Sequence, residues 1–187
     1  MKEIVAIFAT LLAIAGNVPY LWSIVRGTVR PHPYTWLVGT IVSATVFFGI
    51  LAKGAGIGAL PVAASEVFTV IIFLFSLKFG FDDITHKDRI FLAIALAALI
   101  PWLLMHDPTL TIVIAVSIDV LSFLPTFRKT IANPSTEMPI LYGSNVLRHV
   151  LVLYSLATYN IATTFHSIAM ICMNTAMIFI ILFPRKK

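Results

Sequence analysis

The sequence predicts an all-α polytopic membrane protein, and three observations support this: its composition, the lengths of its apolar runs and the placement of its charges. Of the 187 residues, 59% are hydrophobic and 11% are charged, and the mean hydropathy is +0.98. A soluble domain carries about 25% charged residues. With so few charged residues, the chain could not cover the surface of a globular protein in water. It is therefore predicted to lie in lipid and not to fold as a soluble enzyme.

Seven runs are long enough to cross a bilayer, since a transmembrane helix needs about 20 mostly apolar residues. They lie at 4–25, 34–52, 57–78, 89–105, 109–128, 138–158 and 162–183. Short separators that carry helix breakers or charges divide them. These are Gly27 with Pro31, His32 and Pro33; Lys53 and Gly54; Asp82, Asp83 and Asp88; His106, Asp107 and Pro108; Asn133 and Pro134; and Asn160.

The first run has a second interpretation, as a signal peptide. Lys2 precedes an apolar stretch that contains Ala13 and Ala15 in the spacing of a cleavage site. However, Glu3 lies beside Lys2, and the apolar run continues to Val25. We expect the run to be retained as the first span.

The basic residues predict the orientation, because cytoplasmic loops of membrane proteins carry an excess of Lys and Arg. With seven spans and the N-terminus outside, Lys2 and Lys53 lie outside and Arg148 lies within a span. Ten of the 13 basic residues then face the cytoplasm, as does the C-terminus: Arg26, Arg30, Lys78, Lys87, Arg89, Arg128, Lys129, Arg185, Lys186 and Lys187. The net charge of +5 is thus assigned to orientation and to contact with membrane lipids, and not to nucleic acid.

An internal repeat is predicted by the register of prolines and spans. A shift of 106 residues places Pro19 on Pro125 and Pro33 on Pro139, and spans 1–3 on spans 5–7. Identities in this alignment are few, so the evidence is the gapless coincidence of span boundaries and basic loops. Two parallel three-helix units at 1–80 and 108–187, joined by a linker with the fourth helix at 81–107, form a 3+1+3 arrangement known among transporters.

The segments GNVPYLWSIVRGTVRPHPYTWLV and LSFLPTFRKTIANPSTEMPILY carry a family resemblance. Each has a late Pro, a basic turn, a short polar loop and the next helix. The chain resembles the SWEET and PQ-loop superfamily of seven-helix transporters, and also uncharacterised bacterial membrane proteins with an RPH-x-x-x-W signature. Tyr20 and Thr126 stand where a PQ-loop protein has Gln after the Pro, which leaves the substrate class open.

The resemblance implies a transporter of a small polar solute, such as a sugar, an amino acid or a related metabolite, that works by alternating access in a bacterial inner membrane. The alternative is a seven-helix receptor or scaffold that binds a ligand without transport, since the superfamily includes the KDEL receptor. The oligomeric state stays open, with a homo-oligomer as one alternative. Pro19 and Pro125 are the expected hinges, because a proline within a helix frees a carbonyl and kinks the helix.

Ionisable and amide side chains near the middle of the spans are the candidate solute-binding residues. Burying a charge in a bilayer is costly, so such residues face the bundle interior and are functional candidates. Because four helices carry them at similar depth, one shared cavity is expected. The candidates are Glu66, Asp119, Arg148 and Asn174, with His149 at the edge of the cavity and Asn145, Ser43 and Trp36 as further lining residues.

Asp119 is expected to pair with Arg148, which leaves Glu66 without a cation and suggests that Glu66 binds and releases a proton during transport. The alternative for Asp119, Arg148 and Asn174 is a structural link between helices. In the SWEET family, Asn174 would match an Asn of the sugar site, and Glu66 at the other such position implies a charged or zwitterionic substrate, or proton coupling. His166 is expected at the outer interface.

The chain carries none of the usual hydrolase, nucleotide-binding or zinc-protease motifs. Its single Cys172 lies in an apolar run, which gives no disulfide framework and no cysteine-based metal site. We therefore expect no enzymatic activity, no cofactor and no metal.

Overall fold

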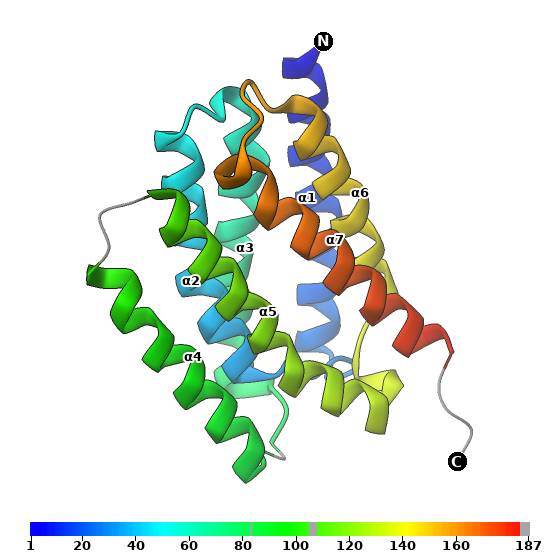
Figure 1. Ribbon diagram of the computed structural model, residues 1–187. Helices are drawn as coiled ribbons and strands as arrows, with labels where there is room; N and C mark the ends of the chain where they lie inside the picture. The colour runs from blue at the N-terminus through cyan, green and yellow to red at the C-terminus, as the bar shows by residue number, and fades with distance from the viewer. Residues whose placement is uncertain (83, 105–107, 184–187) are drawn as a thin grey trace.

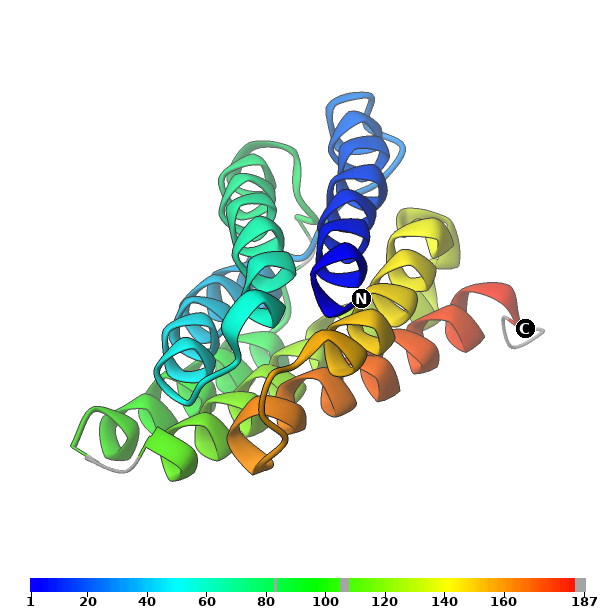
Figure 2. The ribbon, with the colours of Figure 1, turned by 90° about the horizontal axis from the view of Figure 1, so that it is seen from above.

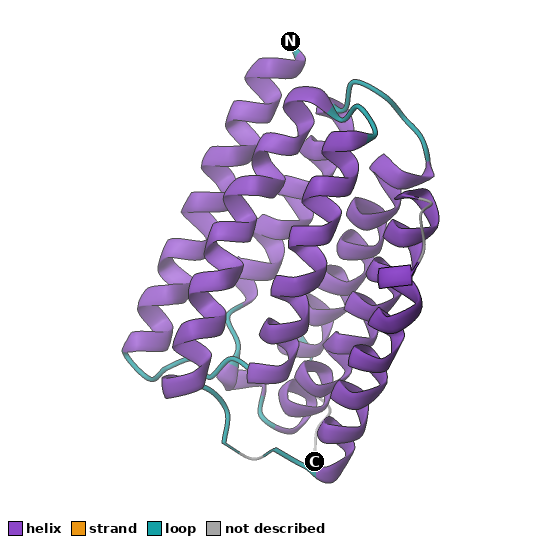
Figure 3. Ribbon diagram, turned by 90° about the vertical axis from the view of Figure 1, so that its left-hand side faces the viewer, coloured by secondary structure: helices purple, strands orange, loops and turns teal. Residues whose placement is uncertain are grey.

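The computed structural model describes residues 1–82, 84–104 and 108–183. Asp83, His106, Asp107, Arg185, Lys186 and Lys187, which entered the predictions above, lie outside the described residues. All regular secondary structure in the described ranges is helical (Figures 1 and 3), which confirms the all-α prediction.

In these described ranges, seven α-helices and two short 3-10 turns follow one another. They are α1 Lys2–Val25, α2 Pro33–Ala52, η1 Gly56–Ala59, α3 Leu60–Phe79, α4 His86–Leu104, α5 Pro108–Ala132, η2 Pro134–Thr136, α6 Pro139–Ser155 and α7 Ile161–Leu182. Each predicted span corresponds to one helix. Two predicted ends were wrong: α5 continues past 128 to Ala132, and α6 ends at Ser155 instead of 158.

Among the residues that the structure describes, five helical segments are long and apolar enough to cross a membrane: α1, α2, η1 with α3, α5 and α7. This confirms a multi-pass membrane protein. The 17-residue α6 is shorter and carries Arg148 and His149, and α4 begins with charged residues. For these two helices the predicted crossing stays a prediction.

Helix packing follows a regular scheme. The third helix of each predicted unit lies between the first and the second, since α3 packs against α1 and α2, and α7 packs against α5 and α6. The first helix of each unit also packs against the second helix of the other, as α1 with α6 and α2 with α5. This set of contacts is unchanged when α1, α2 and α3 exchange with α5, α6 and α7. Helix α4 lies at the margin, against α5 and α2 (Figure 2).

The starts of the first and second helices of each predicted unit coincide with the predicted register. Lys2 and Pro108 begin α1 and α5, and Pro33 and Pro139 begin α2 and α6, so both pairs are separated by the same 106 residues. Proline is favoured at the first position of a helix, where its missing N–H is not needed. Pro19 and Pro125 lie within α1 and α5, each 17 residues after the start of its helix.

Basic side chains gather at one end of the bundle, named the basic end here. The connections α1–α2, α3–α4 and α5–α6 meet there, at the lower end of the bundle in Figure 1. Arg26, Arg30, Lys78, Lys87, Arg128 and Lys129 lie at this end, and Lys2 and Lys53 lie at the opposite end.

Close packing between α1 and α6 depends on Gly16. A Cβ atom there would lie 2.1 Å from the Ser144 hydroxyl oxygen and 2.8 Å from its Cβ. We expect Gly16→Val to lower the free energy of unfolding by about 1–3 kcal/mol, because extra atoms in a packed interface force backbone shifts. Thermal unfolding in detergent measures this. Gly143→Val is the control, since nothing lies within 4 Å of a Cβ at Gly143; equal losses in both variants would contradict the prediction.

Candidate solute-binding cavity

A cavity of about 100 Å³ lies among α2, α3, α5, α6 and α7. Such a volume holds several water molecules or one small solute, since a single water needs about 10–15 Å³ of this kind of space. The side chains around it come from both predicted units. They are Thr35, Trp36, Gly39, Ser43, Val62, Ser65, Thr69, Asp119, Phe123, Thr126, Leu141, Tyr142, Asn145, Arg148, His149, His166, Met170 and Asn174. Seven of the eight candidate residues named from the sequence are in this set, and Glu66 is not.

Helices α2 and α6 face the cavity with equivalent positions. Four positions of α2 line it, and the residues 106 positions later on α6 line it too, which gives the pairs Thr35 and Leu141, Trp36 and Tyr142, Gly39 and Asn145, and Ser43 and His149. Their chemistry differs, because the larger polar side chains Asn145 and His149 stand where α2 has glycine and serine. Polar recognition groups are therefore concentrated on the α6 side.

Arg148 is the most unusual group of the cavity, because its guanidinium is buried without a carboxylate. The residue is 4% exposed. Its Nη2 lies 2.7 Å from His149 Nε2, and its Nε donates a long hydrogen bond of 3.4 Å to Asn145 Oδ1. Its Nη1 is buried and has no hydrogen-bond partner among the described residues. The predicted ion pair with Asp119 is not formed in the described structure.

The ion-pair prediction fails because of helix order. Asp119 lies on α5 and Arg148 on α6, and α7 packs against both of these helices. The opposite charges and similar depth of Asp119 and Arg148 suggested a contact between them. These features do not indicate that α7 lies between α5 and α6. Both side chains line the same cavity without meeting.

The contact with Arg148 defines the state of His149. A guanidinium can only donate hydrogen bonds, so His149 Nε2 must accept. The proton of a neutral imidazole is then on Nδ1, which lies 3.2 Å from the Ser167 hydroxyl oxygen. This tautomer is assigned from the hydrogen-bond network. His149 therefore holds the guanidinium in place and is not itself a proton carrier in this state.

Two amide side chains extend the donor set. Asn145 Nδ2 donates to Asn174 Oδ1 at 3.4 Å, and Asn174 Nδ2 donates to the Met170 carbonyl oxygen at 2.7 Å. Each amide nitrogen carries two hydrogens, so each retains a second N–H. Together with Arg148 Nη1, these groups give the α6–α7 side of the cavity a surplus of donors over acceptors.

Asp119 lies on the α5 side of the cavity and is 5% exposed. Its Oδ1 is 3.5 Å from the Ser122 hydroxyl oxygen, and its Oδ2 is 3.9 Å from His166 Nε2. His166 is 6% exposed, and its ring centre is 5.4 Å from that of His149. A partly unpaired carboxyl group therefore occupies one wall and an unpaired guanidinium occupies another.

The expected interfacial position of His166 is wrong, because its side chain is buried and lines the cavity. Figure 1 shows the reason: the connection after α6 descends along the bundle, so α7 begins below the level at which α1 begins. Asn160 and Thr163 form a capping box at this start. The second turn of α7 is therefore deeper than its place in the sequence suggested.

Glu66 is half-buried on α3 and accepts a hydrogen bond from the Ser43 hydroxyl. Ser43 lines the cavity and Glu66 does not. On α3 the cavity is faced by Val62, Ser65 and Thr69, which lie on one side of the helix because they are spaced three and four residues apart. Glu66 is turned about 100° from Ser65, so it reaches the cavity only through Ser43.

The aromatic residues near the basic end divide into two groups. Trp22 is 55% exposed and lies beside Arg26, with the guanidinium carbon 4.8 Å from the ring centre, as expected of an interfacial anchor. Tyr20 is fully buried, with its ring centre 5.8 Å from that of Trp36, and Trp36 lines the cavity. Tyr20 is therefore a core residue, whereas Trp22 is an interfacial anchor.

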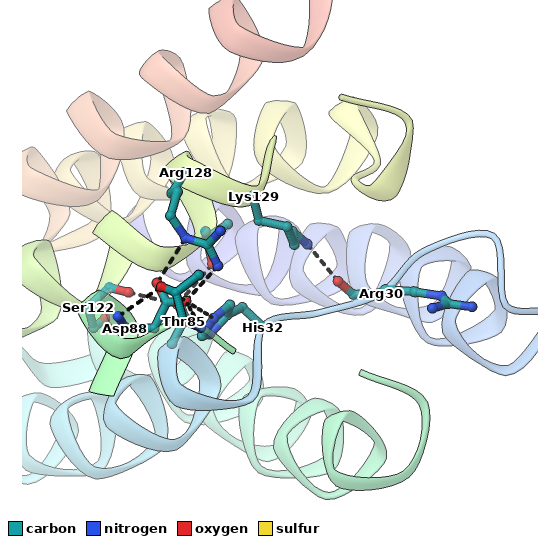
Figure 4. Close-up of polar contacts among 9 residues, drawn as sticks. Arg30, His32, Thr85, Asp88, Ser122, Arg128 and Lys129 are labelled. Carbon is teal, nitrogen blue, oxygen red and sulfur yellow. Dashed lines mark hydrogen bonds and ion pairs between the residues drawn. The ribbon is translucent and has the colours of Figure 1, made fainter. Parts of the chain in front are cut away.

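Below the cavity, buried polar contacts tie both halves together at the basic end (Figure 4). Asp88 on α4 is fully buried, and its carboxylate accepts from Arg128 Nε at 3.0 Å and from the Thr85 hydroxyl at 2.7 Å. His32 Nε2 is 3.7 Å from the same carboxylate. The sequence analysis missed this contact, because it treated charges near span ends only as orientation signals.

A second buried pair lies beside the first. The Lys129 ammonium contacts the Glu137 carboxylate, and both side chains are fully buried. Lys129 also donates to the Arg30 carbonyl oxygen at 2.6 Å, and the Tyr20 hydroxyl donates to Glu137 at 3.0 Å. We name His32, Thr85, Asp88, Arg128, Lys129 and Glu137 the basic-end cluster. The RPH segment and two charged loops lie at the same predicted end of the bundle, and this was the signal in the sequence that could have indicated the basic-end cluster.

Acid is expected to weaken the fold through His32. Burial lowers the pKa of His32 to about 4 from its ordinary 6.5, and Lys129 and Arg128 act in the same direction while Asp88 opposes them. The unfolded chain therefore binds this proton at a higher pH than the folded chain does. The resulting stability is complete above pH 6.5 and is lost as the pH falls towards 4, by on the order of 3 kcal/mol.

Thermal unfolding from pH 7.5 to 4 measures this loss. We expect His32→Phe to flatten the decline, because Phe fills a similar volume beside Tyr34 and Phe81 and cannot take a proton. His86→Gln, which removes an exposed histidine of the same end, is the matched control and should follow the unsubstituted protein. An unchanged slope in His32→Phe would refute the assignment.

Comparisons of the chain with protein-family models, with curated proteins and with solved structures find no match.

Proposed function

We propose that the chain is a seven-span transporter with the 3+1+3 arrangement, which carries a small polar solute across a bacterial inner membrane by alternating access. The observation that carries this proposal is the cavity itself, where a buried, incompletely paired guanidinium faces a space inside a bundle of apolar helices. An unpaired charge within a membrane protein is costly to keep and marks a substrate or ion pathway.

The packing scheme supports a rocking mechanism. We assign residues 1–80 and 108–187 to two parallel units joined by 81–107, and the equivalent contacts of α1–α3 and α5–α7 support this assignment. In this state the basic-end cluster closes the inner side, because Lys129 of one unit contacts the Arg30 carbonyl oxygen of the other. Opening to the cytoplasm would separate these contacts, with Pro19 and Pro125 as equivalent hinges in α1 and α5.

The basic end supports an orientation with the N-terminus outside and the C-terminus in the cytoplasm, by the excess of Lys and Arg there. At that surface Arg26 and Arg30 are exposed and would contact lipid headgroups. The chain is not an enzyme in this proposal, and its partners are the solute and the membrane lipids. A homo-oligomer is compatible with it.

Uptake into proteoliposomes tests the proposal. The purified protein is reconstituted and supplied with labelled sugars, amino acids and organic acids, and empty liposomes are the control. Saturable uptake of one solute class is the expected result. Saturable binding in detergent without uptake would replace the transporter by the second candidate, a receptor or scaffold with the same cavity.

Proton coupling is proposed to use Glu66, whose hydrogen bond with Ser43 links it to the cavity wall. We expect Glu66→Gln to remove the stimulation of uptake by an inward proton gradient, because an amide cannot bind and release a proton. Exchange of labelled for unlabelled solute without a gradient should continue. Glu3→Gln, at the exposed N-terminus, is the control. Stimulation that persists in Glu66→Gln would exclude this role.

A further inference from the structure

We propose that the solute carries one carboxylate, which binds Arg148 Nη1 and the free N–H groups of Asn145 and Asn174. This inference rests on the proposed function and specifies the substrate class of the same cavity. It starts from the fact that Nη1 is buried and unpartnered beside a space large enough for a small molecule.

Charge distinguishes a carboxylate from a sugar. Arg148 has no carboxylate within ion-pair distance among the described residues, so its charge is uncompensated in this state. Sugar hydroxyls would hydrogen-bond to Nη1 but would leave that charge in place. A carboxylate supplies the missing charge, and guanidinium–carboxylate hydrogen bonds are among the stronger ones in proteins.

The donor pattern points to the same ligand. Arg148, Asn145 and Asn174 are linked in one chain of hydrogen bonds that ends at the Met170 carbonyl oxygen. Each link uses one N–H and leaves another without an acceptor. A group made only of acceptors, as a carboxylate is, completes this set, whereas an amide or an ammonium group would not.

Asp119 limits the charge of the solute. Its carboxyl group lines the same cavity from α5, so a dianion such as phosphate would meet a like charge. A monocarboxylate carries a smaller charge and meets less of that repulsion. A donor on the adjacent carbon, either an ammonium or a hydroxyl, would have the Asp119 oxygens as its acceptor. The expected class is therefore small amino or hydroxy monocarboxylic acids, which the volume of about 100 Å³ also fits.

The test uses matched probes with the unsubstituted protein. Lactate and alanine are compared with lactamide and alaninamide, in which a neutral amide replaces the carboxylate, and with phosphate and glucose. Binding to the detergent-purified protein is measured by calorimetry, and uptake is measured in proteoliposomes. We expect lactate or alanine to bind and the matching amide to bind at least about 10-fold more weakly.

Variants connect the binding to the cavity. Arg148→Lys keeps the charge but loses the fork of donors, and we expect it to weaken carboxylate binding about 10-fold; Arg148→Gln should weaken it more. Asn145→Ala should weaken it less than either. Arg26→Gln, which removes an exposed arginine beside Trp22, should bind as the unsubstituted protein does.

The outcomes separate this inference from the proposed function. Carboxylate binding without uptake would support the site and refute transport. Uptake of glucose without binding of lactate or alanine would support transport and overturn the inference. Equal affinity for acid and amide, preferred binding of phosphate, or carboxylate binding that is unchanged in Arg148→Gln would also overturn it. Binding and uptake of neither class would refute both.

Discussion

Arg148→Gln is expected to abolish solute uptake and, at the same time, to raise the thermal stability of the protein. The guanidinium is buried, and among the described residues its Nη1 has no hydrogen-bond partner and no carboxylate is paired with it. A charge in this position lowers the stability of the folded protein, whereas the amide nitrogen of Gln, which extends about as far as Arg148 Nε, can keep the contact with Asn145. We expect a gain of about 1–3 kcal/mol in the free energy of unfolding.

Thermal unfolding in detergent, together with uptake into proteoliposomes, measures both effects. The same substitution at Arg128 is the control, because its guanidinium is paired with the buried Asp88 carboxylate. Arg128→Gln leaves that carboxylate without its main partner and should lower stability. Opposite signs at the two arginines are the expected result. A loss of stability in Arg148→Gln equal to that in Arg128→Gln would show that Arg148 is a structural link between helices.

Glu137→Leu is expected to be among the most damaging substitutions outside the cavity. It leaves the fully buried Lys129 ammonium without its carboxylate and removes the acceptor of the Tyr20 hydroxyl. Breaking a buried ion pair by removing one partner costs about 3–5 kcal/mol. Unfolding in detergent, followed by circular dichroism, should show this loss.

A double-substitution cycle separates the charge from the packing. Lys129→Met with Glu137→Leu removes both charges and should recover most of the stability lost in Glu137→Leu, because no uncompensated charge remains. Tyr20→Phe, which removes only the hydroxyl at Glu137, should cost about 1 kcal/mol. If the losses at Lys129 and Glu137 simply add, the two side chains do not stabilise each other.

Much of the fold was predictable because lipid imposes strict rules. Backbone groups in a bilayer must be hydrogen-bonded within the segment, so apolar runs of sufficient length predict helices, and Pro33 and Pro139 indicate where two of them begin. The same physics places ionisable residues towards the interior, which brought Asp119 and Arg148 to the cavity.

The remaining features depend on rotation and depth of the helices, which composition does not encode. Glu66 and Ser65 are neighbours in the sequence, yet only Ser65 lines the cavity, because adjacent residues point in different directions on a helix. His166 is buried because α7 starts deep in the bundle. The pair of Lys129 and Glu137 joins the end of one helix to a loop, and helix periodicity does not predict such a contact.

The exchange of partners between α1 and α6, and between α2 and α5, has a consequence for how the protein is made. In each half, the first and second helices pack mainly against helices of the other half. Neither half alone therefore encloses the polar side chains around Arg148 and Asp119. When only residues 1–80 have emerged from the ribosome, the first half still lacks the helices against which it packs in the folded protein. Folding in the bilayer can therefore be completed only after α6, which packs against α1, has been synthesised near the end of translation.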